Sequence, residues 1–328
     1  MNGVYLTLKG VPSDGPTKKD EVVFLLDPQG AWVSSIDDGS FEVEGICVRM
    51  YDALAGAVFG TLEEYHKARC LAPNFAFSTG LNSESSLPKA KFEQVLKIAG
   101  SKRDINRLLY LIDCGKLVSN IQECTKEITH LRGEFYRALN LDVLLYSPVT
   151  EQDGVRLFTS PVVTKIHAVL GFIFIRLHSL LDYVTKLTYE VDHLQRGGFE
   201  AYPRLRSNKI LFGNRKHISI GNAPGTVFES CDEIIEIETY RNHIIHDGLL
   251  DDIPKVYQVV ESSRIVEKYV LLPDRGPNGR LEKYVNRNLF YGGEDKINLR
   301  LPSLIKIFNN RVFATLTLVA RNLEASSA

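Results

Sequence analysis

The sequence predicts a mainly α-helical protein. We expect a bundle of four to five helices with a small β-hairpin insertion, preceded by an N-terminal region that mixes helix and strand. Apolar residues recur at spacings of three and four over long segments, the pattern of helices that pack one face into a core. Between the last two of these segments, apolar and polar residues alternate as in strands. With 328 residues, 44% of them hydrophobic, the chain can bury a sizeable core.

Four long segments carry the helical pattern. They cover about residues 104–145, 162–196, 227–247 and 301–323. Pro148 and Gly154 end the first, and the second begins after Ser160-Pro161 and ends before Gly197-Gly198. Four such helices predict a bundle. The strand-like insertion covers about residues 255–300, with the alternation confined to its first part.

The first ninety residues are expected to form a separate α+β region. Its predicted elements are a strand, a hairpin, a helix and a loop, at residues 4–8, 22–33, 49–71 and 72–88. The loop is rich in Pro, Ser, Asn and Gly, so we place a domain boundary near residue 90. This gives an N-terminal domain, residues 1–90, to which no chemistry is assigned, and a helical domain, residues 91–328.

Charge and cysteine usage favour a cytoplasmic protein. The net charge of −1 shows no global preference for nucleic acid or membranes. Five scattered cysteines without a CxxC pair indicate reduced, buried thiols. The first ten residues lack the pattern of a signal peptide. The most apolar stretch, residues 166–184, contains His167, Arg176, His178 and Asp182, which favours a buried helix of a soluble protein over a membrane span.

Residues 241–248, with the sequence RNHIIHDG, are the most informative stretch. They place an arginine, an amide and two histidines at the end of an otherwise apolar and acidic helix. An arginine can hold phosphoryl oxygens while a histidine moves a proton, so this set can cleave a phosphodiester without a metal. Gly248 is expected to cap the helix, and the negative end of the helix dipole favours the charged form of His246.

The spacing within the motif predicts how its side chains point. Arg241 falls on the same three-four seam as Ile237 and Ile244, where a buried residue is expected, and His243 is expected to be solvated or to face a second copy. Asn242 and His246 are four residues apart and share a face. Arg241 and His246 are about 140° apart around the helix. Either the last turn unwinds, or a second chain completes the site; we favour an isologous homodimer through this helix, which brings each arginine near the other chain's histidine.

Arg241-Asn242-x-x-x-His246, at the end of a bundle helix, resembles the RNxxxH motif of the HEPN superfamily. The resemblance covers roughly residues 100–325 by helix pattern. Members are mostly prokaryotic and occur in toxin–antitoxin, abortive-infection and CRISPR-associated systems. The resemblance implies a metal-independent endoribonuclease without a cofactor, with a toxin or antiviral defence role and an active site shared across a homodimer. Arg241 and His246 would be catalytic, and Asn242 would support the site. Gly248 stands where the HEPN group that pairs with nucleotidyltransferase antitoxins has a tyrosine.

A basic loop between the second and third helices is the expected RNA contact. Residues 196–226 hold six basic residues against Glu200 alone, a net charge of +5, with Phe199, Tyr202 and Phe212 interleaved. Cations with aromatics suit single-stranded RNA with splayed bases. A solvated loop that neutralises the acidic start of the third helix is the alternative. The residues expected to bind substrate are Arg204, Arg206, Lys209, Arg215, Lys216 and His243.

Three alternatives stay open at this point. Arg241 and His246 are ordinary helical residues if Arg241 pairs with Glu238 and His246 interacts only with the helix dipole. His246-Asp247 with His217 resembles the HD phosphohydrolases, in which His and Asp bind a divalent metal. Helical bundles also bind RNA or partner proteins without cleaving anything. If the protein is a nuclease, the additional N-terminal region and strand insertion favour control by a regulatory protein partner, a trigger or a rearrangement.

Overall fold

The computed structural model describes residues 3–16, 21–99, 103–142 and 152–325. The protein is mainly α-helical with small antiparallel sheets, which confirms the predicted class. The chain divides into two compact units, each built from separate stretches of sequence. Unit 1 comprises Met1–Phe41, Cys124–Leu180 and Ser230–Arg311. Unit 2 comprises Glu42–Glu123, Leu181–Glu229 and Val312–Ala328.

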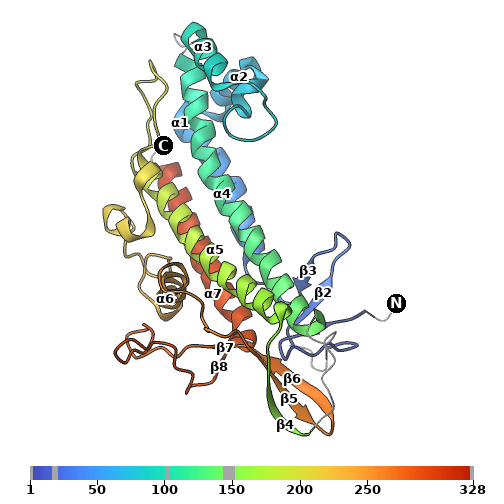
Figure 1. The fold of residues 1–328 in the computed structure, drawn as a ribbon. Coiled ribbons are helices and arrows are strands. Elements are labelled where there is room, and N and C mark those ends of the chain that lie inside the picture. The colour runs from blue at the N-terminus through green and yellow to red at the C-terminus, as the bar shows by residue number, and fades with distance from the viewer. Residues whose placement is uncertain (1–2, 17–20, 100–102, 143–151, 326–328) are drawn as a thin grey trace. The chain divides into compact units, whose positions relative to one another are not determined.

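The four predicted long helices are all present (Figure 1). They are α4 (Arg103–Arg137), α5 (Pro161–Asp192), α6 (Asp232–His246) and α7 (Ile297–Ala325). A π-helical turn, Ala138–Asp142, follows α4, and the predicted remainder of that helix to residue 145 lies outside the described residues. The third helix begins five residues later than expected, because Thr226 to Glu229 form turns and bends and Cys231 is an extended N-cap residue. Helices α4, α5 and α7 contribute residues to both units.

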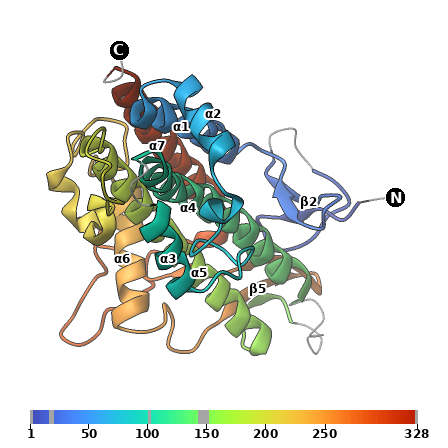
Figure 2. The same ribbon diagram turned by 90° about the horizontal axis from the view of Figure 1, so that it is seen from above.

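Unit 1 contains the N-terminal halves of α5 and α7, the C-terminal part of α4, and all of α6. α6 lies beside α5 in both views (Figure 1, Figure 2), and the rings of Phe174 and Tyr240 are 5.1 Å apart. The apolar seams predicted from the spacing form its core. Residues at most 2% exposed include Ile166, Leu170, Ile173, Ile234, Ile237, Leu301, Ile305 and Phe308.

The N-terminal residues pack with these helices instead of forming a domain that ends near residue 90. Strands β1 (Leu6–Thr7), β2 (Val23–Leu26) and β3 (Trp32–Ser34) form an antiparallel sheet, which confirms the predicted strand and hairpin.

Two buried asparagines and an ion pair fix this segment. Asn140 exchanges hydrogen bonds with the backbone of Thr7 at 3.0 and 3.1 Å. Asn298 donates to the carbonyl of Leu8 at 2.7 Å. Arg132 and Asp38 form a buried ion pair at 2.7 Å. These bonds give the physical reason why the compact units do not follow the expected boundary.

The strand insertion forms a hairpin, as expected. Strands β5 (Val256–Glu261) and β6 (Arg264–Tyr269) pair antiparallel. A third strand, β4 (Gly154–Phe158), pairs with β5 and was not predicted. Short strands β7 (Leu271–Leu272) and β8 (Asp295–Lys296) also pair, and they close the long connection before α7.

Unit 2 differs from the expected single helix at residues 49–71. Two helices, α1 (Ser40–Phe59) and α2 (Leu62–Leu71), are separated by Gly60 at φ +80° and by Thr61, whose side chain caps α2 by accepting from the backbone of Glu64. The predicted loop at 72–88 contains a short 3₁₀ turn, and a further helix, α3 (Lys89–Ala99), follows it. Gly60 breaks the helix because positive φ interrupts the helical backbone.

Helix α5 behaves as the buried helix that the sequence indicates. Among the described residues, α5 is the single helix whose length and apolar composition would allow it to cross a membrane. The bent pair α1–α2 passes the same test only if the two helices are counted as one span. Its polar residues have partners within the protein: His167 donates to the carbonyl of Lys255 at 3.0 Å, Arg176 pairs with Glu127, and Asp182 accepts from the backbone of Phe212 at 2.8 Å.

All five cysteines are free thiols in the structure. Cys47, Cys114 and Cys124 are buried, as expected, whereas Cys70 is exposed and Cys231 is half-buried. Burial raises the pKa of Cys47 to about 12 and that of Cys124 to about 11, so these thiols stay protonated and unreactive near neutral pH.

Candidate functional site

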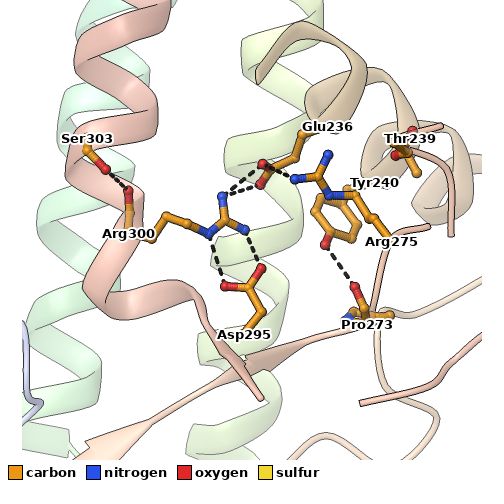
Figure 3. Close-up of polar contacts among 9 residues, drawn as sticks. Glu236, Thr239, Tyr240, Pro273, Arg275, Asp295, Arg300 and Ser303 are labelled. Atoms are coloured by element: carbon orange, nitrogen blue, oxygen red, sulfur yellow. Dashed lines mark hydrogen bonds and ion pairs between the residues drawn. The ribbon is translucent and has the colours of Figure 1, made fainter. Parts of the chain in front are cut away.

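A buried ionic network holds α6 in unit 1. Glu236 is 3% exposed, and its carboxylate accepts hydrogen bonds from Arg300 at 2.6 and 2.8 Å and from Arg275 at 2.8 Å. Asp295 accepts two further bonds from Arg300, so one guanidinium bridges two carboxylates (Figure 3). Glu236 belongs to the acidic start of the third helix, and its burial was not predicted. The missed signal is its spacing of four residues from Tyr240 and seven from His243, which places all three on one buried face of the helix.

The charges of this network compensate one another. Burial raises the pKa of Glu236, and the two arginines only partly offset that effect. Burial lowers the pKa of Arg300, but its bonds to Asp295 and Glu236 outweigh this, so its pKa lies above the ordinary value. Removal of one partner would therefore leave a poorly solvated charge.

The segment between β7 and β8 is fastened to α6 beside this network. The hydroxyl of Tyr240 donates to the carbonyl of Pro273 at 2.9 Å, as Figure 3 shows, and that of Thr239 donates to the carbonyl of Gly279 at 3.2 Å. Gly279 has φ +75°, and a Cβ there would lie 2.5 Å from Ile235. Glycine is thus required for the close approach. The strand insertion therefore helps to position the helix that carries the motif.

The motif residues lie at the C-terminal end of this fixed helix. Arg241 is half-buried, and its Nη1 donates to Oδ1 of Asn242 at 2.8 Å; Asn242 and His246 are exposed. The structure thus corrects the expectation that Arg241 is buried on the seam. The α-helix continues through His246, so the alternative of an unwound last turn is not observed.

His243 is the buried residue of this turn, which corrects the expectation that it is solvated or faces a second copy. It is 5% exposed, and its Nε2 donates to the carbonyl of Leu249 at 3.0 Å. Because a carbonyl only accepts, Nε2 carries the proton, and Nδ1 lies 3.4 Å from the carboxylate of Asp247. His243 therefore stabilises the end of α6, and its burial is inconsistent with direct contact to a substrate.

The chain reverses after α6 and exposes apolar side chains beside the motif. Asp247 caps the helix, and Gly248 follows at φ +130°, a conformation that favours glycine. Ile245, Leu249 and Ile253 are 48%, 53% and 63% exposed. Ile245 within the motif and Leu249, whose carbonyl bonds to His243, therefore place exposed apolar side chains at the same end of α6 as the polar motif residues.

The basic loop belongs to unit 2, whereas the motif belongs to unit 1. Of its basic side chains, Arg196, Arg204, Arg206, Lys209 and Lys216 are exposed. Arg215 is half-buried, and its guanidinium lies 4.3 Å from the ring centre of Phe212. The exposed cations remain able to contact an anionic partner, while Arg215 also has a structural contact.

The aromatic residues of this loop do not form the expected stacking surface. Phe199 and Phe212 are 0% and 1% exposed, and Phe212 stacks on Phe228. Tyr202 is 37% exposed, and its hydroxyl donates to Asp113. The two buried phenylalanines anchor the loop and are not available to stack on bases.

The residues considered for a metal site belong to different compact units. His217 belongs to unit 2, and His246 and Asp247 belong to unit 1. Across the described ranges, no group of three or more His, Cys, Asp or Glu side chains lies close enough to hold a metal ion. The arrangement offers no ligand set for the HD-type alternative.

Comparison with known proteins found no match among protein-family models, curated proteins or solved structures.

Proposed function

We propose that the protein is a metal-independent endoribonuclease of HEPN type, located in the cytoplasm and acting in toxin or antiviral defence. One observation carries the proposal: Arg241, Asn242 and His246 lie together at the end of a helix that a buried network holds in place. Arg241 and Asn242 are linked by a hydrogen bond, and the imidazole of His246 is exposed. This set provides a phosphate ligand and a proton-transfer group without a metal.

The reaction uses a nucleophile that RNA itself supplies. The ribose 2′-oxygen attacks the adjacent phosphorus and loses its proton, and the bond from phosphorus to the 5′-oxygen breaks. His246 assists the proton transfer, and Arg241 stabilises the anionic phosphorane with Asn242 as its support. The products are a 2′,3′-cyclic phosphate and a 5′-hydroxyl. DNA has no 2′-hydroxyl and is not cleaved by this route.

The proposed active site is completed by a second copy of the chain. Because α6 is helical through His246, Arg241 and His246 stay about 140° apart around its axis. The exposed Ile245, Leu249 and Ile253 supply apolar surface for a two-fold contact at this end of the helix. Such a contact places Arg241 of each protomer near His246 of its partner.

The RNA backbone is proposed to contact the exposed cations of the basic loop. Arg204, Arg206, Lys209 and Lys216 are exposed and would hold phosphates. Because Phe199 and Phe212 are buried, we expect electrostatic contact without base stacking on these two rings. Binding should therefore weaken steeply as salt concentration rises.

The decisive experiment is incubation of the full-length protein with a mixed RNA pool in EDTA, followed by mapping of the cut ends. We expect cleavage that leaves 2′,3′-cyclic phosphates, and a loss of about 10²-fold or more in rate in Arg241→Ala and in His246→Ala. His130→Ala is the matched control, because His130 is an exposed histidine of α4 outside the motif. Cleavage that persists in both motif variants would refute the assignment, and so would a requirement for a divalent metal.

If a regulatory partner or trigger restrains the enzyme, the purified protein alone will cleave slowly. Expression in cells then supplies the missing factor, and total RNA is compared between the wild type and His246→Ala. A wild-type chain that leaves cellular RNA intact, with no more cut ends than the variant, favours a non-catalytic module that binds RNA or a partner protein. The exposed apolar residues beside the motif are the observation that supports this second candidate.

A further inference from the structure

Unit 2 contains a pocket that shares no residue with the proposed catalytic motif. It has a volume of about 530 Å³, within the range of small-molecule sites. Three cationic side chains line it from three parts of the chain: Lys116 from α4, Lys186 from α5 and Arg204 from the basic loop. Their sequence separation shows that the fold, and not a local charge run, brings them together.

The charge of this pocket is not neutralised by its own lining. Within the described residues, neither Lys186 nor Arg204 has an ion-pair partner, and Asp113 is the carboxylate in the lining. Asp113 accepts a hydrogen bond from Tyr202, and burial raises its pKa, an effect that Tyr202 and Lys116 partly offset. Three cations thus face one partly buried carboxylate, which leaves the pocket positive and suited to an anion.

A buried hydroxyl in the lining is also without a partner. Ser207 is 0% exposed, its backbone N–H donates to the buried carboxylate of Glu190 at 2.8 Å, and Oγ has no hydrogen-bond partner among the described residues. Buried hydroxyls are rarely left unsatisfied without a reason. A ligand oxygen in the pocket would supply the missing bond. Tyr110 also donates to Glu190, so this segment of the loop is held rigidly.

A second pocket adjoins the first within unit 2 and has aromatic walls. Its volume is about 550 Å³, and the two pockets share Leu81, Lys116 and Asn120. Tyr65 and Phe77 line it, and the guanidinium of Arg69 lies 6.0 Å from the centre of each ring. A planar ring of a ligand could stack there while its charged group reaches the cations.

We infer that unit 2 binds a phosphorylated small molecule with an aromatic ring. Lys116, Lys186 and Arg204 hold the phosphate, the hydroxyl of Ser207 donates to one of its oxygens, and the ring occupies the pocket of Tyr65 and Phe77. Two or more phosphates would suit three cations better than one. The inference shares Arg204 with the proposed RNA contact but no residue with the motif, since the pocket residues lie in unit 2 and the motif lies in unit 1.

Isothermal titration calorimetry of the full-length protein tests this inference with adenosine diphosphate, pyrophosphate and adenosine. We expect saturable binding of adenosine diphosphate, weaker binding of pyrophosphate, and weaker binding still of adenosine. Lys186→Gln and Arg204→Gln should each lower the affinity for adenosine diphosphate at least tenfold. Phe77→Leu should lower it for adenosine diphosphate but not for pyrophosphate. Melting curves check that each variant folds.

Lys209→Gln is the matched control, because Lys209 is an exposed cation of the same loop that does not line the pocket. This substitution should leave the affinity for adenosine diphosphate unchanged. Equal losses in Lys209→Gln and Arg204→Gln would overturn the inference and indicate a diffuse RNA-binding surface. Absence of saturable binding by any of the three probes at millimolar concentration would overturn it as well.

Discussion

At the residue scale, the described structure contains a fully buried lysine. Lys268 of β6 is 0% exposed, and its Nζ donates to the carbonyl of Asn140 at 2.8 Å. That carbonyl belongs to the π-helical turn after α4. Burial lowers the pKa of Lys268 from 10.5 to about 7, because the charged form loses its hydration.

This shift predicts a pH-dependent stability. Between pH 7 and 10.5 the unfolded chain holds a proton on Lys268 that the folded chain releases, so stability rises with pH across this window. Below pH 7 the lysine is charged in both states, and the folded state carries the full cost of burying that charge, at most about 5 kcal/mol.

The free energy of unfolding of Lys268→Met should therefore exceed that of the wild type by the largest margin near pH 6, and by a smaller margin at pH 9.5. Urea unfolding at the two pH values measures this. Lys9→Met is the control, because Lys9 is exposed. An equal effect of Lys268→Met at both pH values would contradict the prediction.

A second residue-scale prediction concerns Glu236. Its replacement by alanine leaves the partly buried Arg275 without its ion-pair partner and Arg300 with Asp295 alone, and should lower the free energy of unfolding by about 3 kcal/mol or more. Asp232→Asn, in the exposed first turn of the same helix, should cost roughly 0.5 kcal/mol through the helix dipole. Similar losses in the two variants, measured by chemical denaturation, would show that the network does not hold α6.

At the element scale, the contact between α4 and the N-terminal sheet depends on one helical glycine. A Cβ at Gly133 would collide with the backbone carbonyl of Trp32 in β3. Gly115, in the same helix, has room, since its Cβ would meet the ring of Tyr51 at 3.4 Å. The two positions share a helical backbone and differ in what lies against them.

Alanine substitutions at these two glycines measure the effect of helix propensity on stability separately from the effect of packing. Gly115→Ala should stabilise the protein by up to about 1 kcal/mol, as alanine does in a helix. Gly133→Ala should destabilise it by roughly 1–3 kcal/mol, because the collision outweighs the gain in propensity. Trp32 is the only tryptophan of the chain, so its fluorescence reports on this contact directly. A Gly133→Ala variant with unchanged fluorescence and raised Tm would show that β3 does not pack there.

At the scale of the whole molecule, the proposed shared active site predicts complementation. Arg241→Ala and His246→Ala are each expected to be inactive. In a mixed dimer, one of the two composite sites combines the intact arginine of one chain with the intact histidine of the other. Random mixing of equal amounts should therefore restore roughly a quarter of wild-type activity.

The control for this experiment is a mixture of Arg241→Ala with the double variant, which contains no intact pair across the dimer. It should remain inactive. If the two single variants also remain inactive after mixing, although sedimentation shows mixed dimers, the site lies within one chain. If sedimentation shows only monomers, the two-fold contact at α6 is wrong.

Much of the fold was predictable from local patterns. The apolar faces of α5 and α7, and the alternating apolar positions of β5 and β6, follow from the burial of apolar side chains at the periods of a helix and of a strand. Strand β4 was missed because it is short and mostly exposed, so its pairing with β5 leaves little apolar signal. The expected boundary near residue 90 relied on loop composition, whereas the asparagine and arginine bonds that fix the first 41 residues to unit 1 join positions over 90 residues apart.

By itself, the sequence determined the helical class, the main elements, and the position of an Arg-Asn-His motif at the end of a helix, because these depend on periodicity and neighbouring residues. Only the tertiary structure decided which polar side chains are buried. It left Arg241 half-buried and buried His243, placed the carboxylate of Glu236 between two arginines, and buried Phe199 and Phe212. Burial is decided by what packs against a residue from distant parts of the chain, and helical spacing specifies a direction without specifying what lies there.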